Sequence, residues 1–229
     1  MAIFKIKESH IRPLVSAITA VFILLAAGNA LAGIPHQTLC LTVGALCLGS
    51  LWLTPWEISL ALLFSAIGDL FGSYGNLLAQ MGSFAAAHIS YIYFFVRRYH
   101  RKVEHDRKLT EKAKGYMMVT TLCTIALLIL FLAAVVPEVL AGIIRTGVSI
   151  YSIIICFMLI TALLQRSMLY ALGALFFVIS DFLLAWNMFV HQIPHASAAI
   201  LCSYFIAQWL IFIRATPYRV PHPVHLLRF

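Results

Sequence analysis

Long apolar segments separated by short polar ones cover almost the whole chain. Each apolar segment approaches the ~20 residues that an α-helix needs to cross the hydrocarbon core of a bilayer. None alternates apolar and polar residues with a period of two, as the strands of a membrane barrel do. The pattern therefore predicts eight transmembrane helices, at residues 13–33, 37–53, 56–74, 78–96, 115–136, 139–163, 168–189 and 195–213.

The composition supports a membrane protein. Of the 229 residues, 62% are hydrophobic and only 10% are charged, whereas a soluble domain is about half apolar and about a quarter charged. Backbone groups in lipid have to be paired within their own segment, which favours helices. We therefore expect residues 1–229 to form a single all-α transmembrane domain, a polytopic helical bundle.

The basic residues are distributed unevenly along the chain. If the N-terminus is cytoplasmic, fifteen of the sixteen Lys and Arg residues fall on the cytoplasmic side, eight of them in a predicted basic loop at 97–114. This distribution follows the positive-inside rule and predicts cytoplasmic N- and C-termini in a plasma membrane, such as a bacterial inner membrane. The net charge of +8 then reflects topology and possible contact of the 97–114 loop with anionic lipid, and not binding of nucleic acid.

The beginning of the chain has features of a signal peptide, with a basic head, an apolar body and a small-residue end at 30–32. Its apolar stretch is long for a signal peptide, and the charge distribution fits eight helices. We therefore expect this segment to be an uncleaved first helix.

Two carboxylates interrupt apolar segments. Asp69 lies in "LLFSAIGDLF" and Asp181 in "GALFFVISDFLLA". A charge at a helix centre costs about 2.5–3.5 kcal/mol on insertion scales, so both side chains should face the bundle interior and find partners there. Two neighbouring acids cannot both ionise cheaply, and a protonated acid beside an ionised one is suited to acid–base catalysis. Arg145, the remaining basic residue, lies in the sixth helix, where it could keep one aspartate charged.

The two aspartates belong to a possible internal repeat. When Asp69 is aligned with Asp181, "ALLFSAIGDLF" lies over "GALFFVISDFL" and, with one insertion, "AAAHISY" (85–91) lies over "AAILCSY" (198–204). The third and fourth helices thus resemble the seventh and eighth in the same orientation. Parallel repeats of this kind occur in membrane transporters.

Other polar residues share helix faces by the i, i+3, i+4 rule. His88 and Tyr91 lie on one face of the fourth helix, and Tyr204 and Gln208 on one face of the eighth. With Arg145 they predict a polar cavity in which these five residues bind substrate. His88 could instead be a packing histidine, and Arg145 could either neutralise an aspartate or bind a phosphate.

Metal binding is not expected. His191 and His195 have helical i, i+4 spacing, but Pro194 interrupts the helix between them and no third ligand is evident. The sequence therefore predicts neither a metal site nor a cofactor.

Four motifs in order, "LLFSAIGDLF", "MGSFAAAHISYIY", "GALFFVISDFLLA" and "SYFIAQWLI", resemble the lysoplasmalogenase (YhhN-like) family of integral membrane hydrolases. The resemblance implies hydrolysis of the vinyl ether bond of a lysophospholipid within the bilayer, giving a fatty aldehyde and a glycerophospho-head group. It also implies that Asp69 and Asp181 are the catalytic acids.

The chemistry of a vinyl ether suits two carboxyl groups. Protonation of a double-bond carbon forms an oxocarbenium ion, and glycoside hydrolysis uses two carboxyl groups to pass through a similar cation. One aspartic acid would donate the proton, and the other would stabilise the cation and activate water. The alternative function is a proton-coupled transporter of a small solute, because buried Asp and Arg residues also form proton relays.

Overall fold

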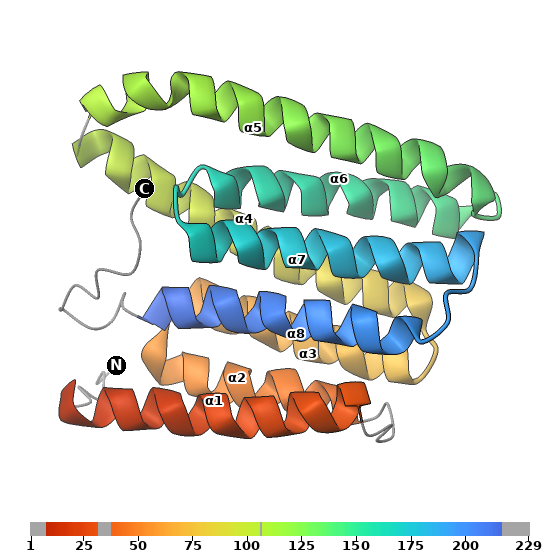
Figure 1. The fold of residues 1–229 in the computed structure, drawn as a ribbon, viewed down its shortest axis with the longest axis horizontal. Coiled ribbons are helices and arrows are strands. Elements are labelled where there is room, and N and C mark those ends of the chain that lie inside the picture. Colours follow the sequence, from red (N-terminus) through yellow and green to blue (C-terminus); the bar gives the residue numbers. More distant parts are fainter. Residues whose placement is uncertain (1–7, 32–37, 106, 217–229) are drawn as a thin grey trace.

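The structure is a computed structural model that describes residues 8–31, 38–105 and 107–216. In this part of the chain the fold consists of eight α-helices, a 3₁₀ turn (η2) and a π-helical turn (η3). Figure 1 shows the helices running alongside one another in one bundle. Their bounds are α1 Glu8–Leu31, α2 Leu39–Leu53, α3 Trp56–Ser73, α4 Leu77–His105, α5 Arg107–Ala134, η2 Val136–Glu138, α6 Ile143–Leu163, α7 Met168–Ala185, η3 Trp186–Val190 and α8 Ala196–Ala215.

The expected polytopic helical bundle is confirmed, with each of the eight predicted segments forming one helix. Six helices are long and apolar enough to cross a membrane, and these are α1, α3, α5, α6, α7 and α8. The other two helices, α2 and α4, differ from these six in length or in composition. α2 is apolar but has only 15 residues, whereas α4 has 29 residues and carries a basic C-terminal part.

The prediction of a loop at 97–114 is wrong. α4 continues to His105 and α5 begins at Arg107, so the backbone of this basic segment is helical on both sides of residue 106. Lys, Arg and Glu are good helix formers, and 97–114 contains neither Gly nor Pro to end a helix. The side chains of 102–113 lie outside the described residues, so their contact with anionic lipid stays a prediction.

The ends of the bundle agree with the charge pattern. The start of α1, the α4–α5 junction and the end of α8 all lie at the left end in Figure 1. We call this the basic end, and the other end, where α3 leads into α4 and α7 into α8, the opposite end. The assignment of the basic end to the cytoplasm stays a prediction.

Local sequence signals set the helix boundaries near the site. Pro55 precedes α3 at its N-cap, where its missing N–H leaves no hydrogen bond unmade. The turn from α3 to α4 contains Gly75 at φ +72°, and Gly142 at φ +130° precedes α6. Positive φ values are accessible to glycine without steric cost, so these two residues allow the chain to reverse at the opposite end.

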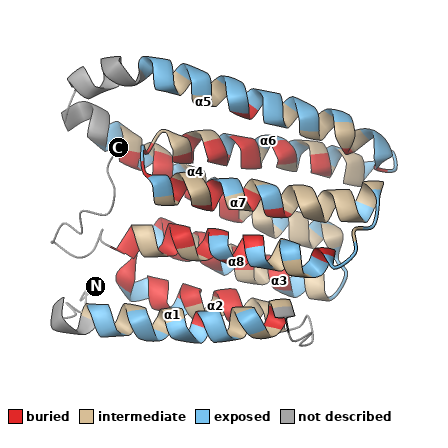
Figure 2. Ribbon diagram, viewed as in Figure 1, coloured by how far each residue is buried: buried red, intermediate tan, exposed pale blue. Residues whose placement is uncertain are grey.

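The core lies between the central helices. α3 packs most extensively on α4, and α7 on α8, while α6 contacts both α4 and α7. Buried aromatic residues, including Tyr91, Phe94, Phe177 and Phe212, fill the centre. Figure 2 shows that α1 and α5, at the two edges, expose most of their outward faces, which are apolar and suited to lipid.

The α3–α4 and α7–α8 pairs are both closely packed hairpins. Their order and direction correspond, as the sequence similarity between them predicts. The two aspartates therefore occupy equivalent places in two similar hairpins, α3 and α7 each supplying one.

Candidate active site

Asp181 of α7 lies in a hydrogen-bonded group with side chains from two other helices. Tyr151 Oη of α6 donates a hydrogen bond of 2.6 Å to Asp181 Oδ2. His88 Nε2 of α4 lies 3.0 Å from Tyr151 Oη and 3.6 Å from Asp181 Oδ2. We call these three residues the Asp181 triad. It joins α4, α6 and α7, because α6 packs between the other two helices.

The direction of hydrogen bonding in the triad follows from its donors. Tyr151 has one hydroxyl proton, and this proton is given to Asp181. Tyr151 Oη therefore accepts from His88, which places the imidazole proton on Nε2 as an inference from the network. The chain runs from His88 to Tyr151 to Asp181 Oδ2, and leaves Asp181 Oδ1 without a partner among the described residues.

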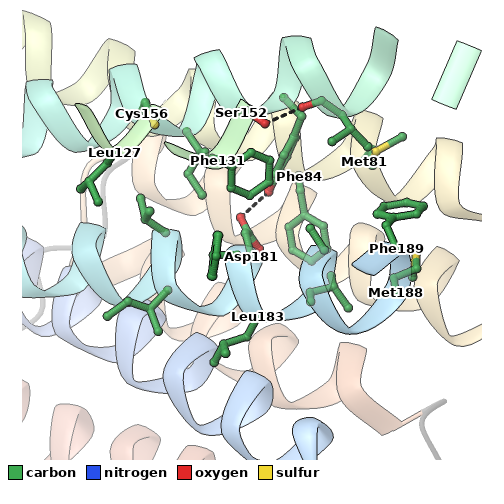
Figure 3. Close-up of a pocket in the computed structure, with 18 of the residues that line it drawn as sticks. Met81, Phe84, Leu127, Phe131, Ser152, Cys156, Asp181, Leu183, Met188 and Phe189 are labelled. Atoms are coloured by element: carbon green, nitrogen blue, oxygen red, sulfur yellow. Dashed lines mark hydrogen bonds between the residues drawn. The ribbon is translucent and has the colours of Figure 1, made fainter. Parts of the chain in front are cut away.

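A cavity of about 250 Å³ lies beside the triad. Residues of α4, α5, α6, α7 and η3 line it, and the polar ones are Gln80, Tyr151, Ser152 and Asp181. Ser152 Oγ donates to the backbone oxygen of Val148 at 2.6 Å, so its proton is already committed. Figure 3 shows Asp181 facing the cavity, with the dashed hydrogen bond to Tyr151 beside it. Asp181 thus supplies the carboxyl group of a chamber whose lining is mostly apolar.

Asp69 of α3 has different surroundings. Its side chain is buried, with the residue 6% exposed, and Oδ2 accepts a hydrogen bond of 2.9 Å from Tyr204 Oη of α8. Close by, Tyr91 Oη of α4 donates to Gln208 Oε1 of α8 at 2.7 Å. We call these four residues the Asp69 cluster. It joins α3, α4 and α8, and none of its members lines the cavity.

Aromatic rings lie between the two groups. Phe84 lines the cavity, and its ring packs edge-on against Tyr204 with centroids 5.8 Å apart. Phe177 contacts His88 at 5.1 Å on one side and Tyr204 at 5.8 Å on the other. These two rings therefore pack between the Asp181 triad and the Asp69 cluster.

Near the two aspartates, three of the buried polar atoms have no hydrogen-bond partner among the described residues. They are Ser65 Oγ, one helical turn from Asp69, together with Gln208 Nε2 and His88 Nδ1. An unsatisfied buried polar group costs about 1–3 kcal/mol, and a bound water commonly satisfies such groups in proteins. Two of the three, Ser65 Oγ and Gln208 Nε2, lie near Asp69. Water can therefore bind near Asp69, whereas the apolar walls of the cavity offer water few partners.

Arg145 does not pair with either aspartate in the described part of the chain. Its Nε donates to Val139 O at 2.7 Å and its Nη2 to Pro137 O at 3.3 Å. The guanidinium thus closes the turn between α5 and α6 at the opposite end. The expectation that Arg145 keeps an aspartate charged is not met, because the side chain reaches back to the preceding turn. Its predicted role in binding phosphate stays a prediction.

The structure brings most of the predicted site residues together in two places. His88 lies beside Asp181, while Tyr91, Tyr204 and Gln208 lie around Asp69. Sequence reasoning missed Tyr151, the residue that bonds both His88 and Asp181. A signal was present, because a buried tyrosine needs a partner for its hydroxyl and Tyr151 lies within an apolar helix.

Among the residues that the structure describes, no three His, Cys, Asp or Glu side chains are grouped so as to hold a metal ion. The polar groups of the site are joined by hydrogen bonds between a histidine, a phenol and a carboxyl group. A carboxyl group with one oxygen held by a phenol and the other facing an apolar chamber can deliver a proton to a bound apolar molecule.

Comparison with known proteins gives a consistent assignment. The model of the YhhN family matches residues 30–215. The chain is similar to the lysoplasmalogenase TMEM86B of Sus scrofa, with 31% identity over 152 residues, which are 66% of this chain and 59% of that protein. It is also similar to the lysoplasmalogenase TMEM86B of Homo sapiens, with 30% identity over 162 residues, which are 70% of this chain and 64% of that protein.

A shorter match to the lysoplasmalogenase TMEM86A of Homo sapiens has 43% identity over 49 residues, which are 21% of this chain and 20% of that protein. The chain spans less than two thirds of the length of these relatives. No solved structure matches it.

Proposed function

Because the chain belongs to the YhhN family, we propose that it is a membrane hydrolase that cleaves the vinyl ether bond of lysoplasmalogens. Its relatives are named lysoplasmalogenases. The observation that carries the proposal is Asp181, a carboxyl group on the wall of an apolar cavity inside a membrane bundle. A single-chain lipid fits such a cavity, and its double bond needs only a proton to react.

The reaction begins with proton transfer to carbon. Protonated Asp181 gives the proton on Oδ1 to the vinyl carbon remote from the ether oxygen, which breaks an O–H bond and forms a C–H bond. The Tyr151 hydrogen bond to Oδ2 stabilises the carboxylate that results, since hydrogen bonds to a charged form favour it. The positive charge spreads over the ether oxygen and its neighbouring carbon, next to the new carboxylate.

Water then completes the cleavage. A water oxygen adds to the cationic carbon, and its proton returns to the Asp181 carboxylate. Protonated Asp181 then gives a proton to the glycerol oxygen as the bond between this oxygen and the carbon breaks. The hemiacetal hydroxyl loses its proton to the Asp181 carboxylate, which leaves a fatty aldehyde and a free glycerol hydroxyl and restores protonated Asp181. In this scheme one carboxyl group acts as acid and then as base, and His88 positions it through Tyr151.

The role of Asp69 distinguishes two schemes. In the first, Asp181 performs both proton transfers, and the Asp69 cluster supports the helices behind it and holds water. In the second, which follows the sequence-based expectation, Asp69 activates the water and both aspartates are catalytic. The first is favoured by Phe84, which lies between Tyr204 and the cavity.

The experiment that tests the function is aldehyde release from an alkenyl lysophospholipid by the full chain in detergent or liposomes. Run in D₂O, with the aldehyde reduced to an alcohol as it forms, the reaction should place one deuterium on the carbon next to the former carbonyl. The saturated alkyl ether lysolipid of the same length, which lacks the double bond, should release nothing. Absence of aldehyde from both ethanolamine and choline substrates would contradict the proposal and favour transport, which solute flux into proteoliposomes would reveal.

A further inference from the structure

The cavity has two unlike ends, with Asp181 between them. Figure 3 places Cys156 and Leu127 at one end and Met81, Met188 and Phe189 at the other. Along α7 the lining runs from Leu175, which precedes Asp181 by about 9 Å at 1.5 Å per residue, to η3 beyond it. The cavity is therefore elongated along the helices, which suits a chain-like molecule.

The end at Cys156 is apolar and lies inside the bundle. Cys156 is buried in α6, and its neighbours in the lining are aliphatic side chains such as Leu127, Ile155 and Leu175. These residues lie well inside α5, α6 and α7, so the cavity stops within the bundle before it reaches the basic end. A phosphate placed there would lose its hydration without gaining a polar partner, at a large cost.

The other end of the cavity reaches polar groups. Gln80 lines it, and the turn just before α4 carries exposed Asn76, whose Oδ1 accepts a hydrogen bond of 3.1 Å from the Ala79 N–H. His191, just after η3, is exposed as well. A hydrated head group can therefore lie at this end without desolvation.

The cavity is also open at its side. Leu130 of α5 and Ile179 of α7 both line the cavity and are 58% and 39% exposed. α5 packs mainly on α6, so it leaves the flank beside α7 accessible. An apolar chain can enter here from the bilayer.

Resting on the proposed function, we propose that the cavity fixes the direction of its substrate, a single-chain alkenyl ether lipid. The head group lies at the opposite end of the bundle, near Gln80, and the alkenyl chain runs past Asp181 toward Cys156. The lining ends at Cys156 within the bundle, and this end then limits the chain length that the protein accepts. The order of head group, vinyl ether and chain in the lipid matches the order of polar end, carboxyl group and apolar end in the cavity.

Graded alkenyl chain lengths test this direction. Cys156→Phe should lower kcat/KM for the longest chains by about tenfold or more, as expected when a hydrophobic pocket loses the space for a few methylenes, and leave short chains within about twofold. Cys202→Phe is the matched control, because Cys202 is exposed and does not line the cavity. It should leave the chain-length profile unchanged.

Met188→Phe at the other end separates the two possible directions. This substitution should lower kcat/KM by the same factor for all chain lengths, because only the head-group side of the substrate would lie next to residue 188. A chain-length-dependent loss in Met188→Phe, or a length-independent loss in Cys156→Phe, would overturn the proposed direction.

A binding measurement separates this inference from the proposed function. Saturated alkyl ether lysolipids of graded length, which cannot be cleaved, are added to the wild-type chain, and modification of Cys156 by a small maleimide is followed by mass spectrometry of peptides. Long chains should slow modification of Cys156 and leave Cys202 unaffected, while short chains should protect neither. Equal reactivity of Cys156 at every length would refute the inference even if aldehyde is released. Protection without aldehyde release would support the direction of binding and contradict the proposed hydrolysis.

Discussion

Asp69 and Asp181 occupy equivalent positions in two similar helix hairpins, yet they have different neighbours. Asp69 is bonded by Tyr204 across the α3–α8 contact and lies away from the cavity. Asp181 is bonded by Tyr151 of α6 and faces the cavity. By the repeat, Tyr91 corresponds to Tyr204, but Tyr91 donates its proton to Gln208 instead of to Asp181.

The difference lies in the helix that packs beside each hairpin. α6 lies against α4 and α7 and supplies Tyr151, whereas α2 lies against α3 and α8 and supplies no such phenol. The same carboxyl group in the same helix position can therefore serve internal packing in one hairpin and face a ligand chamber in the other. Which role it takes depends on the neighbouring helix and not on its own hairpin.

Asparagine substitution of each aspartate should give the largest contrast. Asp181→Asn removes the proton that the reaction needs, and we expect kcat to fall by about 10²–10⁴-fold, the range for loss of a general acid. Asp69→Asn keeps an oxygen that accepts the Tyr204 bond, so activity should stay within about tenfold, since a net hydrogen bond contributes about 1 kcal/mol. Aldehyde release by folded protein of each variant checks both values.

The same pair decides between the two schemes for water activation. Equal and large losses in Asp69→Asn and Asp181→Asn, with both proteins eluting as the wild type does, would contradict the single-carboxyl scheme and favour two catalytic aspartates.

Removing the hydroxyl of Tyr151 should mainly lower activity, whereas removing the hydroxyl of Tyr204 should mainly lower stability. Tyr151→Phe leaves Asp181 Oδ2 without its donor, and we expect kcat to fall by about 10- to 100-fold with KM little changed, because the bond matters most when the carboxylate forms. Tyr204→Phe leaves buried Asp69 unsatisfied and should cost about 1–3 kcal/mol of stability, read as a lower Tm in detergent. A fall in Tm without loss of kcat for Tyr151→Phe would show that its role is structural.

Two glycines offer a smaller and sharper test. A Cβ at Gly68 would meet the Phe84 ring at 3.0 Å, whereas a Cβ at Gly173 would meet Ile211 Cγ1 at 2.8 Å and the Ala207 carbonyl oxygen at 3.2 Å. Gly68→Ala should push Phe84 toward the cavity and lower kcat/KM about fivefold. Gly173→Ala should strain the α7–α8 contact and lower stability by about 1–3 kcal/mol without changing kcat/KM.

A second substitution controls for the glycine test. Phe84→Leu in the Gly68→Ala background removes the clashing ring and should restore part of the activity. Failure of this restoration would mean that Gly68 acts on Asp69 directly and not through Phe84.

Arg145→Gln should have the smallest effect. It removes donors to two turn carbonyls, so we expect a loss of about 1 kcal/mol in stability and no change in KM. A rise in KM for phosphate-bearing substrates, absent for a head-group-free alkenyl glycerol, would instead support the predicted phosphate contact.

The sequence predicts the helices well because their signal is local. Each apolar segment specifies its own helix, and the polar residues within it show which face turns inward. The error at 97–114 arises because a run of charged residues does not by itself indicate a loop. Lys, Arg and Glu are good helix formers, and this segment is helical on both sides of residue 106.

The site itself is only partly predictable, because it depends on which helices become neighbours. Both aspartates and His88 stand out in apolar surroundings. Tyr151 lies in the same apolar segment as Arg145, the residue of this helix that the sequence predicts in the site. Neighbouring residues on a helix point in different directions, so the important side of α6 can be recognised only once α4 and α7 are in place.

We expect the position of α5 at the edge of the bundle to make the cavity sensitive to the thickness of the surrounding bilayer. This helix forms one wall of the chamber but rests mainly on a single neighbour, α6. Helices whose apolar length differs from the lipid thickness adjust by tilting, and α5 can tilt with little disturbance of the core. Lipids of different acyl length would then widen or narrow the chamber, so the bilayer that dissolves the protein would also adjust the size of its cavity.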